Sequence, residues 1–116
     1  FTTSGGYAQS ISLLKRPNRP TAIFAGSDLQ AMGVYEAARQ LGLRIPEDLS
    51  VVGFDDVQTA AFLGPALTTV RQPLQDMARA AVRMLIEALS TDDVIQPHII
   101  MPTSLVVRNS TQQLEG

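Results

Sequence analysis

The fold is decided by the stretch Ser50-Val51-Val52-Gly53-Phe54-Asp55-Asp56. Its first five residues are mostly apolar and include two β-branched valines, which is typical of a strand buried on both faces of a parallel sheet. Two carboxylates follow at the point where that strand would end. In an open parallel sheet, ligands bind at the carboxyl ends of the strands. The stretch therefore predicts a buried strand whose end forms one edge of a binding site.

The residues upstream of this strand predict a βαβ unit. Residues 21–25 have the composition of a second buried strand, and a helix is expected from about 29 to 41. Ser27 or Asp28 would cap that helix, and Asp28 is the expected cap. Gly42 is the expected left-handed residue at its end. Because strands joined by such a crossover are parallel, Ser27 and Asp55 should lie at the same edge of the sheet.

The flanking segments predict three further helices and two extended pieces. We expect a helix at 5–14 capped by Ser4, a short helix at 57–62 capped by Asp56, and an amphipathic helix at 74–89. Residues 99–101 and 104–107 should be extended, and residues 108–116 should form a frayed tail. The helix at 74–89 carries its apolar side chains on one face, which consists of Leu74, Met77, Ala78, Ala81, Leu85 and Ala88.

Composition indicates a globular chain with one modest core. The chain has 116 residues, of which 45% are hydrophobic and 17% charged. The net charge of -2, with a single lysine, argues against DNA binding by these residues alone. There is no cysteine, no apolar run long enough to span a membrane and no signal-peptide pattern. Because the first residue is Phe1 and not methionine, we expect the chain to be a fragment of a longer protein.

The sequence resembles a known family in four blocks. Residues 51–56 (VVGFDD) and 65–73 (PALTTVRQP) carry the resemblance most clearly, and residues 21–28 and 42–50 extend it. These blocks resemble the effector-binding domain of lactose-repressor/galactose-repressor-type bacterial transcription regulators. The resemblance implies an α/β fold. The chain would form a fragment of a three-layered lobe with a parallel sheet, like that of periplasmic binding proteins.

The same resemblance implies how the fragment is divided. Residues 1–73 and 97–109 would belong to the C-terminal lobe, and the helical segment 74–96 would belong to the N-terminal lobe of a complete protein. The DNA-binding domain would lie outside these residues.

The resemblance also assigns candidate site residues. An aromatic ring at Phe1 would pack on the effector, which suits a purine or the apolar face of a sugar. Asp55 would hydrogen-bond ligand hydroxyl or amino groups, and Gln72 and Leu74 would lie near the effector where the chain crosses between lobes. Ser27 stands where many sugar-binding relatives carry asparagine, so it offers one hydroxyl in place of a forked amide.

The function implied is ligand sensing in the cytoplasm. A small effector, a sugar or a nucleobase-like metabolite, would bind between two lobes. Its binding would shift the equilibrium between two conformations that differ in their affinity for operator DNA. The protein would be a homodimer that contacts operator DNA only through its absent N-terminal domain, with no membrane partner. The dimer face would contain Met32, Tyr35, Phe62 and Leu63, which ordinary core packing would equally explain.

Two other classes of protein share these features. The main alternative is a periplasmic sugar-binding receptor of a transport system. The second is an enzyme or phosphoreceiver, in which Asp55 and Asp56 would form an acidic metal pocket. That pocket needs a further carboxylate and a lysine, whereas Lys15 is expected at the end of a helix. His98 has no other metal ligand nearby in sequence. The sequence therefore predicts no catalytic residue, no metal and no cofactor.

Overall fold

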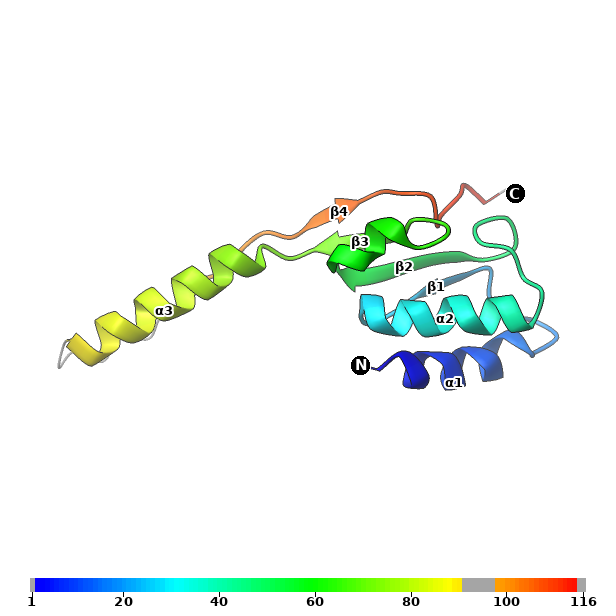
Figure 1. Cartoon of the computed structure of the whole chain (residues 1–116), viewed down its shortest axis with the longest axis horizontal. Coiled ribbons are helices and arrows are strands. Elements are labelled where there is room, and N and C mark those ends of the chain that lie inside the picture. The colour runs from blue at the N-terminus through cyan, green and yellow to red at the C-terminus, as the bar shows by residue number, and fades with distance from the viewer. Residues whose placement is uncertain (1, 91–97, 115–116) are drawn as a thin grey trace. The chain divides into compact units, whose positions relative to one another are not determined.

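The structure of the chain is a computed structural model that describes residues 2–90 and 98–114. Its elements, in chain order, are α1 (Thr3–Leu14), β1 (Ala22–Phe24), α2 (Asp28–Gln40), β2 (Ser50–Asp55), the 3-10 helix η1 (Gln58–Phe62), β3 (Thr68–Arg71), α3 (Leu74–Ser90) and β4 (Ser104–Val106) (Figure 1). The chain divides into two compact units, which are Phe1–Arg71 with Leu105–Gly116, and Gln72–Ser104.

The first unit is built on a sheet with the strand order β1-β2-β3-β4. β2 pairs in parallel with β1 on one side and with β3 on the other, so the predicted βαβ unit is confirmed. Helices α1 and α2 lie side by side on one face of the sheet (Figure 1). The core between these helices and the sheet contains the fully buried side chains of Val34, Leu49, Val51 and Leu67.

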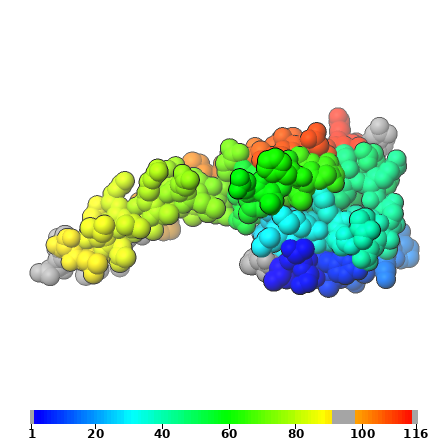
Figure 2. Space-filling view, in the orientation of Figure 1, coloured from blue at the N-terminus to red at the C-terminus, as the bar shows by residue number. Residues whose placement is uncertain are grey.

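Two glycines allow α1 and α2 to approach closely. A Cβ atom added at Gly33 would overlap the backbone oxygen of Thr3 and the backbone nitrogen of Tyr7, and one added at Gly6 would overlap the backbone of Gln30. Only residues without a side chain fit at these two positions. The space-filling view shows the two helices in direct contact (Figure 2).

The helix ends differ from the sequence predictions in two places. The cap of α1 is Thr2 and not Ser4, since the Thr2 hydroxyl accepts a hydrogen bond from Gly5 N. The cap of α2 is Ser27 and not Asp28, because the Ser27 Oγ accepts from Gln30 N at 3.1 Å.

The C-terminal end of α2 agrees with the prediction. Gly42 has a φ of 70°, in the left-handed region. Next to it, Leu43 N donates to Ala38 O at 2.9 Å, which closes the helix as a Schellman motif.

The prediction of a frayed tail from residue 108 is wrong for the residues around Ser110. The Ser110 side chain is fully buried, accepts a hydrogen bond from Thr68 N at 2.8 Å and donates to Val51 O at 2.6 Å. Its backbone oxygen accepts from Val51 N at 2.9 Å. This segment is therefore held against β2 and β3, and it anchors the chain after it returns from the second unit.

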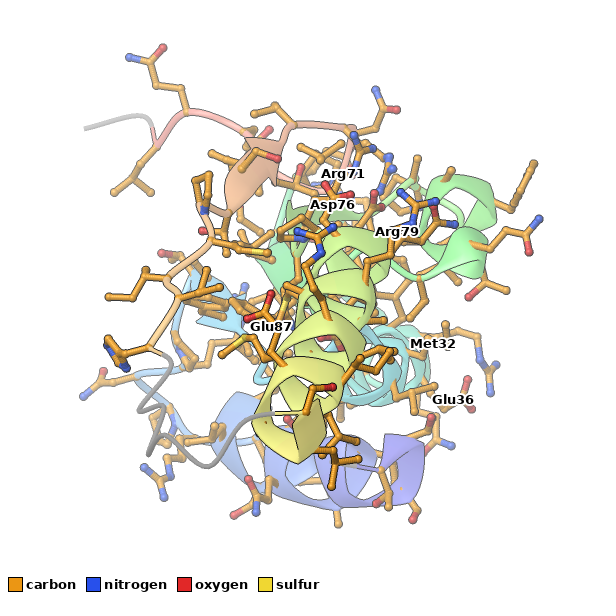
Figure 3. All side chains as sticks on the ribbon, turned by 90° about the vertical axis from the view of Figure 1, so that its left-hand side faces the viewer. Met32, Glu36, Arg71, Asp76, Arg79 and Glu87 are labelled. Carbon is orange, nitrogen blue, oxygen red and sulfur yellow. The ribbon has the colours of Figure 1, made fainter. Side chains whose placement is uncertain are left out.

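The second unit contains α3, which is the amphipathic helix predicted at 74–89. Along it, Arg79 Nη1 lies 3.6 Å from the Asp76 carboxylate, and both side chains are labelled in Figure 3. None of the residues of α3 is buried in the described structure, and Leu85 is 60% exposed. Among the described residues, no helix combines the length and the apolar character needed to cross a membrane.

We expect a protein consisting of residues 1–116 to self-associate through α3. The exposed apolar side chains of α3 include Leu74, Val82, Leu85, Ile86 and Leu89, and contiguous exposed apolar patches are typical of association surfaces. Light scattering should give a mass of at least two chains, and Leu85→Asp should return the mass to that of one chain. A monomer whose α3 amides are protected from hydrogen exchange would contradict this expectation.

Candidate functional site

The carboxyl ends of β1, β2 and β3 meet at one edge of the first unit, and Asp28 lies buried beside this edge. Asp28 begins α2 and is fully buried. Its Oδ2 accepts a hydrogen bond from Val57 N at 2.8 Å, and its Oδ1 accepts from Thr69 Oγ1 at 2.6 Å. A side chain at Gly53 would overlap the Asp28 carboxyl group, so this glycine is required for the close approach. One carboxylate therefore links the start of α2, the exit of β2 and the middle of β3.

At the end of β2 the backbone adopts positive φ angles, which are rare for residues other than glycine. Asp55 has a φ of 121° and Asp56 a φ of 59°. Such conformations cost on the order of 1–3 kcal/mol each and persist only where the surroundings impose them. They concentrate at ligand sites, so two of them in succession at a strand end mark this turn as a functional candidate.

Asp56 is held by two arginines. Its Oδ2 accepts from Arg71 Nε at 2.7 Å and its Oδ1 accepts from Arg108 Nη2 at 2.8 Å. Burial alone would raise the pKa of Asp56, but the hydrogen bonds from Arg71 and Arg108 hold that pKa below its usual value. The prediction that Asp56 caps the following helix is therefore wrong: η1 has no side-chain cap, and Val57 occupies its cap position.

Three of the predicted ligand contacts stand at the carboxyl ends of the parallel strands: Ser27 after β1, Asp55 at the end of β2 and Gln72 after β3. Ser27 and Asp55 thus lie at the same edge of the sheet, as expected from the sequence. Ser27 is only 5% exposed, and its hydroxyl is engaged as the cap of α2. Gln72 follows the last residue of β3 and is partly buried, and Leu74 begins α3 and is half-exposed. Phe1 lies outside the described residues.

Three residues of this edge were not predicted from the sequence. Arg108 is largely buried, and its Nη1 donates to Leu67 O at 2.9 Å in addition to the ion pair with Asp56. Thr69 and Arg71 take part through their bonds to Asp28 and Asp56. An arginine at the end of an apolar extended segment, followed by an asparagine, a serine and a threonine, was the available signal for Arg108.

The predicted dimer residues lie around α2 and the loop after β2. Met32 and Glu36 project from the same side of α2 (Figure 3). Phe62 is 81% exposed, whereas Leu63 packs against the core. Burial raises the pKa of Tyr35 to about 12, so its phenol remains neutral and donates to Pro65 O at 2.7 Å. An exposed phenylalanine beside partly buried neighbours suits an interface, and the assignment of these residues stays a prediction.

The described residues hold no group of three or more histidine, cysteine, aspartate or glutamate side chains arranged for a metal. His98 belongs to the second unit, where it lines a cavity of about 330 Å³ together with Met77, Ile99 and Met101. This environment is mostly apolar, and its lining residues include no second histidine, no cysteine and no carboxylate.

A parallel sheet with helices on one face and polar side chains at its carboxyl edge defines the chain as part of an α/β ligand-binding lobe. The model of the periplasmic binding protein-like domain matches residues 2–111, and the chain belongs to this family, in the group of LacI-type transcription regulators.

Relatives of known class and structure support this assignment. The HTH-type transcriptional regulator MalR of Streptomyces coelicolor is 44% identical over 116 residues, which are 100% of this chain and 33% of that protein. A LacI family regulator from Enterococcus faecium, solved with bound ribose, is 29% identical with a TM-score of 0.90, covering 99% of this chain and 42% of that one.

A third similar protein is the lac repressor dimer bound to operator and the anti-inducer ONPF. It is 32% identical with a TM-score of 0.86, covering 95% of this chain and 38% of that one. The chain spans about a third of the length of the curated relatives it matches. These relatives are named as regulators and repressors of transcription, and not as enzymes.

Proposed function

We propose that this chain is the C-terminal part of the effector-binding domain of a LacI-type bacterial transcription regulator. A sugar or related metabolite binds between two lobes and changes the affinity of the protein for operator DNA. This chain supplies one wall of the binding cleft, and residues 74–96 belong to the other lobe. The DNA-binding domain lies in the remainder of the protein, which works in the cytoplasm as a homodimer.

The observation that carries this proposal is the strained turn at Asp55 and Asp56, at the carboxyl edge of a parallel sheet. Ligands bind at this edge in open α/β sheets, and backbone strain of this kind concentrates at ligand sites. The chain is similar to a regulator solved with ribose, which supports a sugar as the effector. It is also similar to a repressor dimer bound to operator, which supports DNA binding and dimerisation by the complete protein. The regulator is favoured over a transport receptor because the curated relatives are regulators of transcription.

Each predicted site residue takes a role in this proposal. Asp55 accepts hydrogen bonds from ligand hydroxyl groups, and Phe1 stacks on the apolar face of the ligand. Gln72 and Leu74 complete the site where the chain crosses between lobes. Ser27 fixes the start of α2 at the site edge, and its single hydroxyl leaves more room for ligand than an asparagine would. Dimerisation uses the face formed by Met32, Tyr35, Phe62 and Leu63.

The Asp55→Asn variant of the full-length parent protein tests this proposal. A panel of ribose, maltose, cellobiose and sucrose first identifies the sugar that raises the melting temperature of the wild type. Losing a charge-assisted hydrogen bond costs about 1.5–3 kcal/mol, so Asp55→Asn should weaken binding of that sugar about ten- to a hundredfold in isothermal titration.

Operator affinity without sugar should remain that of the wild type in this variant. The control is Asp48→Asn, which removes a carboxylate that pairs with Arg44 away from the site edge. Equal sugar affinity in Asp55→Asn and Asp48→Asn would show that Asp55 makes no ligand contact.

A further inference from the structure

Asp56 directly follows Asp55, the proposed ligand contact. Each of its two carboxylate oxygens accepts a hydrogen bond from a different arginine. Asp56, Arg71 and Arg108 form a connected group that we name the clasp. The Asp56 side chain is 10% exposed and that of Arg108 17%, so the clasp is largely shielded from water on these two sides. Shielding makes the Asp56–Arg108 pair stronger than pairs at the surface, whereas the Arg71 side chain is 56% exposed and forms the weaker of the two pairs.

The two arginines of the clasp lie on the two segments that connect the units of the chain. Arg71 is the last residue of β3, and the chain enters Gln72–Ser104 directly after it. Arg108 lies just after β4, on the segment by which the chain returns. The backbone of Arg108 is fixed in turn, since its N donates to Thr68 Oγ1 at 2.9 Å. Asp56 therefore fastens the exit of β2 to the outgoing and the returning strand at once.

The clasp also imposes the conformation of the turn. Asp55 pairs in register with Arg71, and Asp56 is the next residue along the chain. With Asp56 held by both arginines and Val57 N held by Asp28, the backbone is fixed on the far side of Asp55. These contacts hold Asp55 at its strained φ, because the backbone of the turn cannot reach a more favourable φ without breaking one of them.

We propose that Asp56 is the positioning residue of the effector site, and that the clasp couples the Asp55 contact to the two strands that lead to the second unit. This inference rests on the proposed function, since it concerns the same site. Asp55 is the residue that meets the ligand, and Asp56 sets the direction in which Asp55 points. A displacement of the turn on ligand binding is then transmitted to both connecting strands through the two arginines.

The variant that tests this inference is Asp56→Asn in the full-length parent protein. Asparagine keeps the shape of the side chain but has one acceptor oxygen, and its amide group would face the second arginine as donor against donor. One strand should thus be released from the clasp. The matched control is Asp48→Asn, because both oxygens of Asp48 accept from the Arg44 guanidinium in a pair that lies away from the connecting strands.

Two measurements are made at a temperature where both variants are folded. Hydrogen exchange followed by mass spectrometry should show exchange about tenfold or more faster in residues 54–57, 68–71 and 105–109 of Asp56→Asn, with wild-type rates in Asp48→Asn. The affinity for the sugar selected from the four-sugar panel should fall about tenfold in Asp56→Asn and stay unchanged in Asp48→Asn, because a displaced Asp55 would lose its charge-assisted hydrogen bond to the sugar. A purely structural role would lower the melting temperature and leave the sugar affinity of the folded protein unchanged.

The outcomes separate the inference from the proposed function. Wild-type exchange in the three segments, or wild-type sugar affinity in Asp56→Asn, overturns the positioning role while the sugar-binding function stands. Absence of binding by the wild type to all four sugars counts against the proposed function. In that case the exchange rates alone decide whether the clasp holds the turn, with unchanged rates overturning it.

Discussion

Replacing Asp28 by alanine is expected to lower the free energy of unfolding by about 2–4 kcal/mol, because two hydrogen-bonding groups lose their acceptor in the interior. Val57 N and Thr69 Oγ1 both donate to this one carboxyl group, which is fully buried. The loss should also free the turn after β2 from the start of α2. Urea denaturation followed by circular dichroism measures the change.

Two controls make the Asp28 result specific. Asp28→Asn keeps one oxygen for Val57 N, and its amide can donate to the Thr69 hydroxyl, so most of the stability should be retained. Asp76→Ala removes an exposed carboxylate and should change the free energy of unfolding by no more than about 0.5 kcal/mol. If Asp28→Ala were as stable as Asp76→Ala, the buried link between α2, the exit of β2 and the middle of β3 would not exist as described.

The Gly33→Val variant is expected to be the most damaging single change in the helical layer, with a loss of about 3 kcal/mol or more. The first added carbon already overlaps the backbone of α1 at Thr3 and Tyr7. Backbone atoms cannot rotate away as a side chain does, so the two helices would have to separate. That separation would open the core around Val34, which lies beside Gly33 on α2.

Valine has a higher helix propensity than glycine, so propensity alone would not destabilise Gly33→Val, and the control measures what a valine side chain costs at an exposed position of the same helix. Leu29→Val places the same side chain at an exposed position of α2 and should cost less than about 1 kcal/mol. A Gly33→Val chain that unfolds at the same urea concentration as Leu29→Val would contradict the close approach of the helices.

The sequence predicted the architecture where its signals were local. The βαβ unit followed from two apolar runs and a helical segment between them, and the helix expected at 29–41 is found at Asp28–Gln40. Gly42 was predicted correctly because a left-handed helix end leaves a single-residue signature. The cap of α2 was misassigned since Ser27 and Asp28 are adjacent and both are good caps, and only the three-dimensional contacts of Asp28 distinguish them.

The contacts that build the site edge could not be predicted because they join distant parts of the chain. Arg108 meets Asp56 across 52 positions in sequence, and Ser110 donates to Val51 across 59 positions. Neither partner carries a local pattern that specifies the other. The same lack of a local signal explains why the C-terminal residues were taken for a frayed tail and Asp56 for a helix cap.

We propose that this chain forms part of a sugar-responsive, operator-binding regulator. The most direct measurement is the affinity of the full-length parent for its operator fragment, by fluorescence anisotropy at fixed salt, with and without each sugar of the panel. At least one sugar should change the dissociation constant about five- to 150-fold, the usual range of allosteric coupling, and Asp55→Asn should shift that response to higher sugar concentration. Operator affinity that stays constant with all four sugars, in a protein that binds one of them, would contradict the claim.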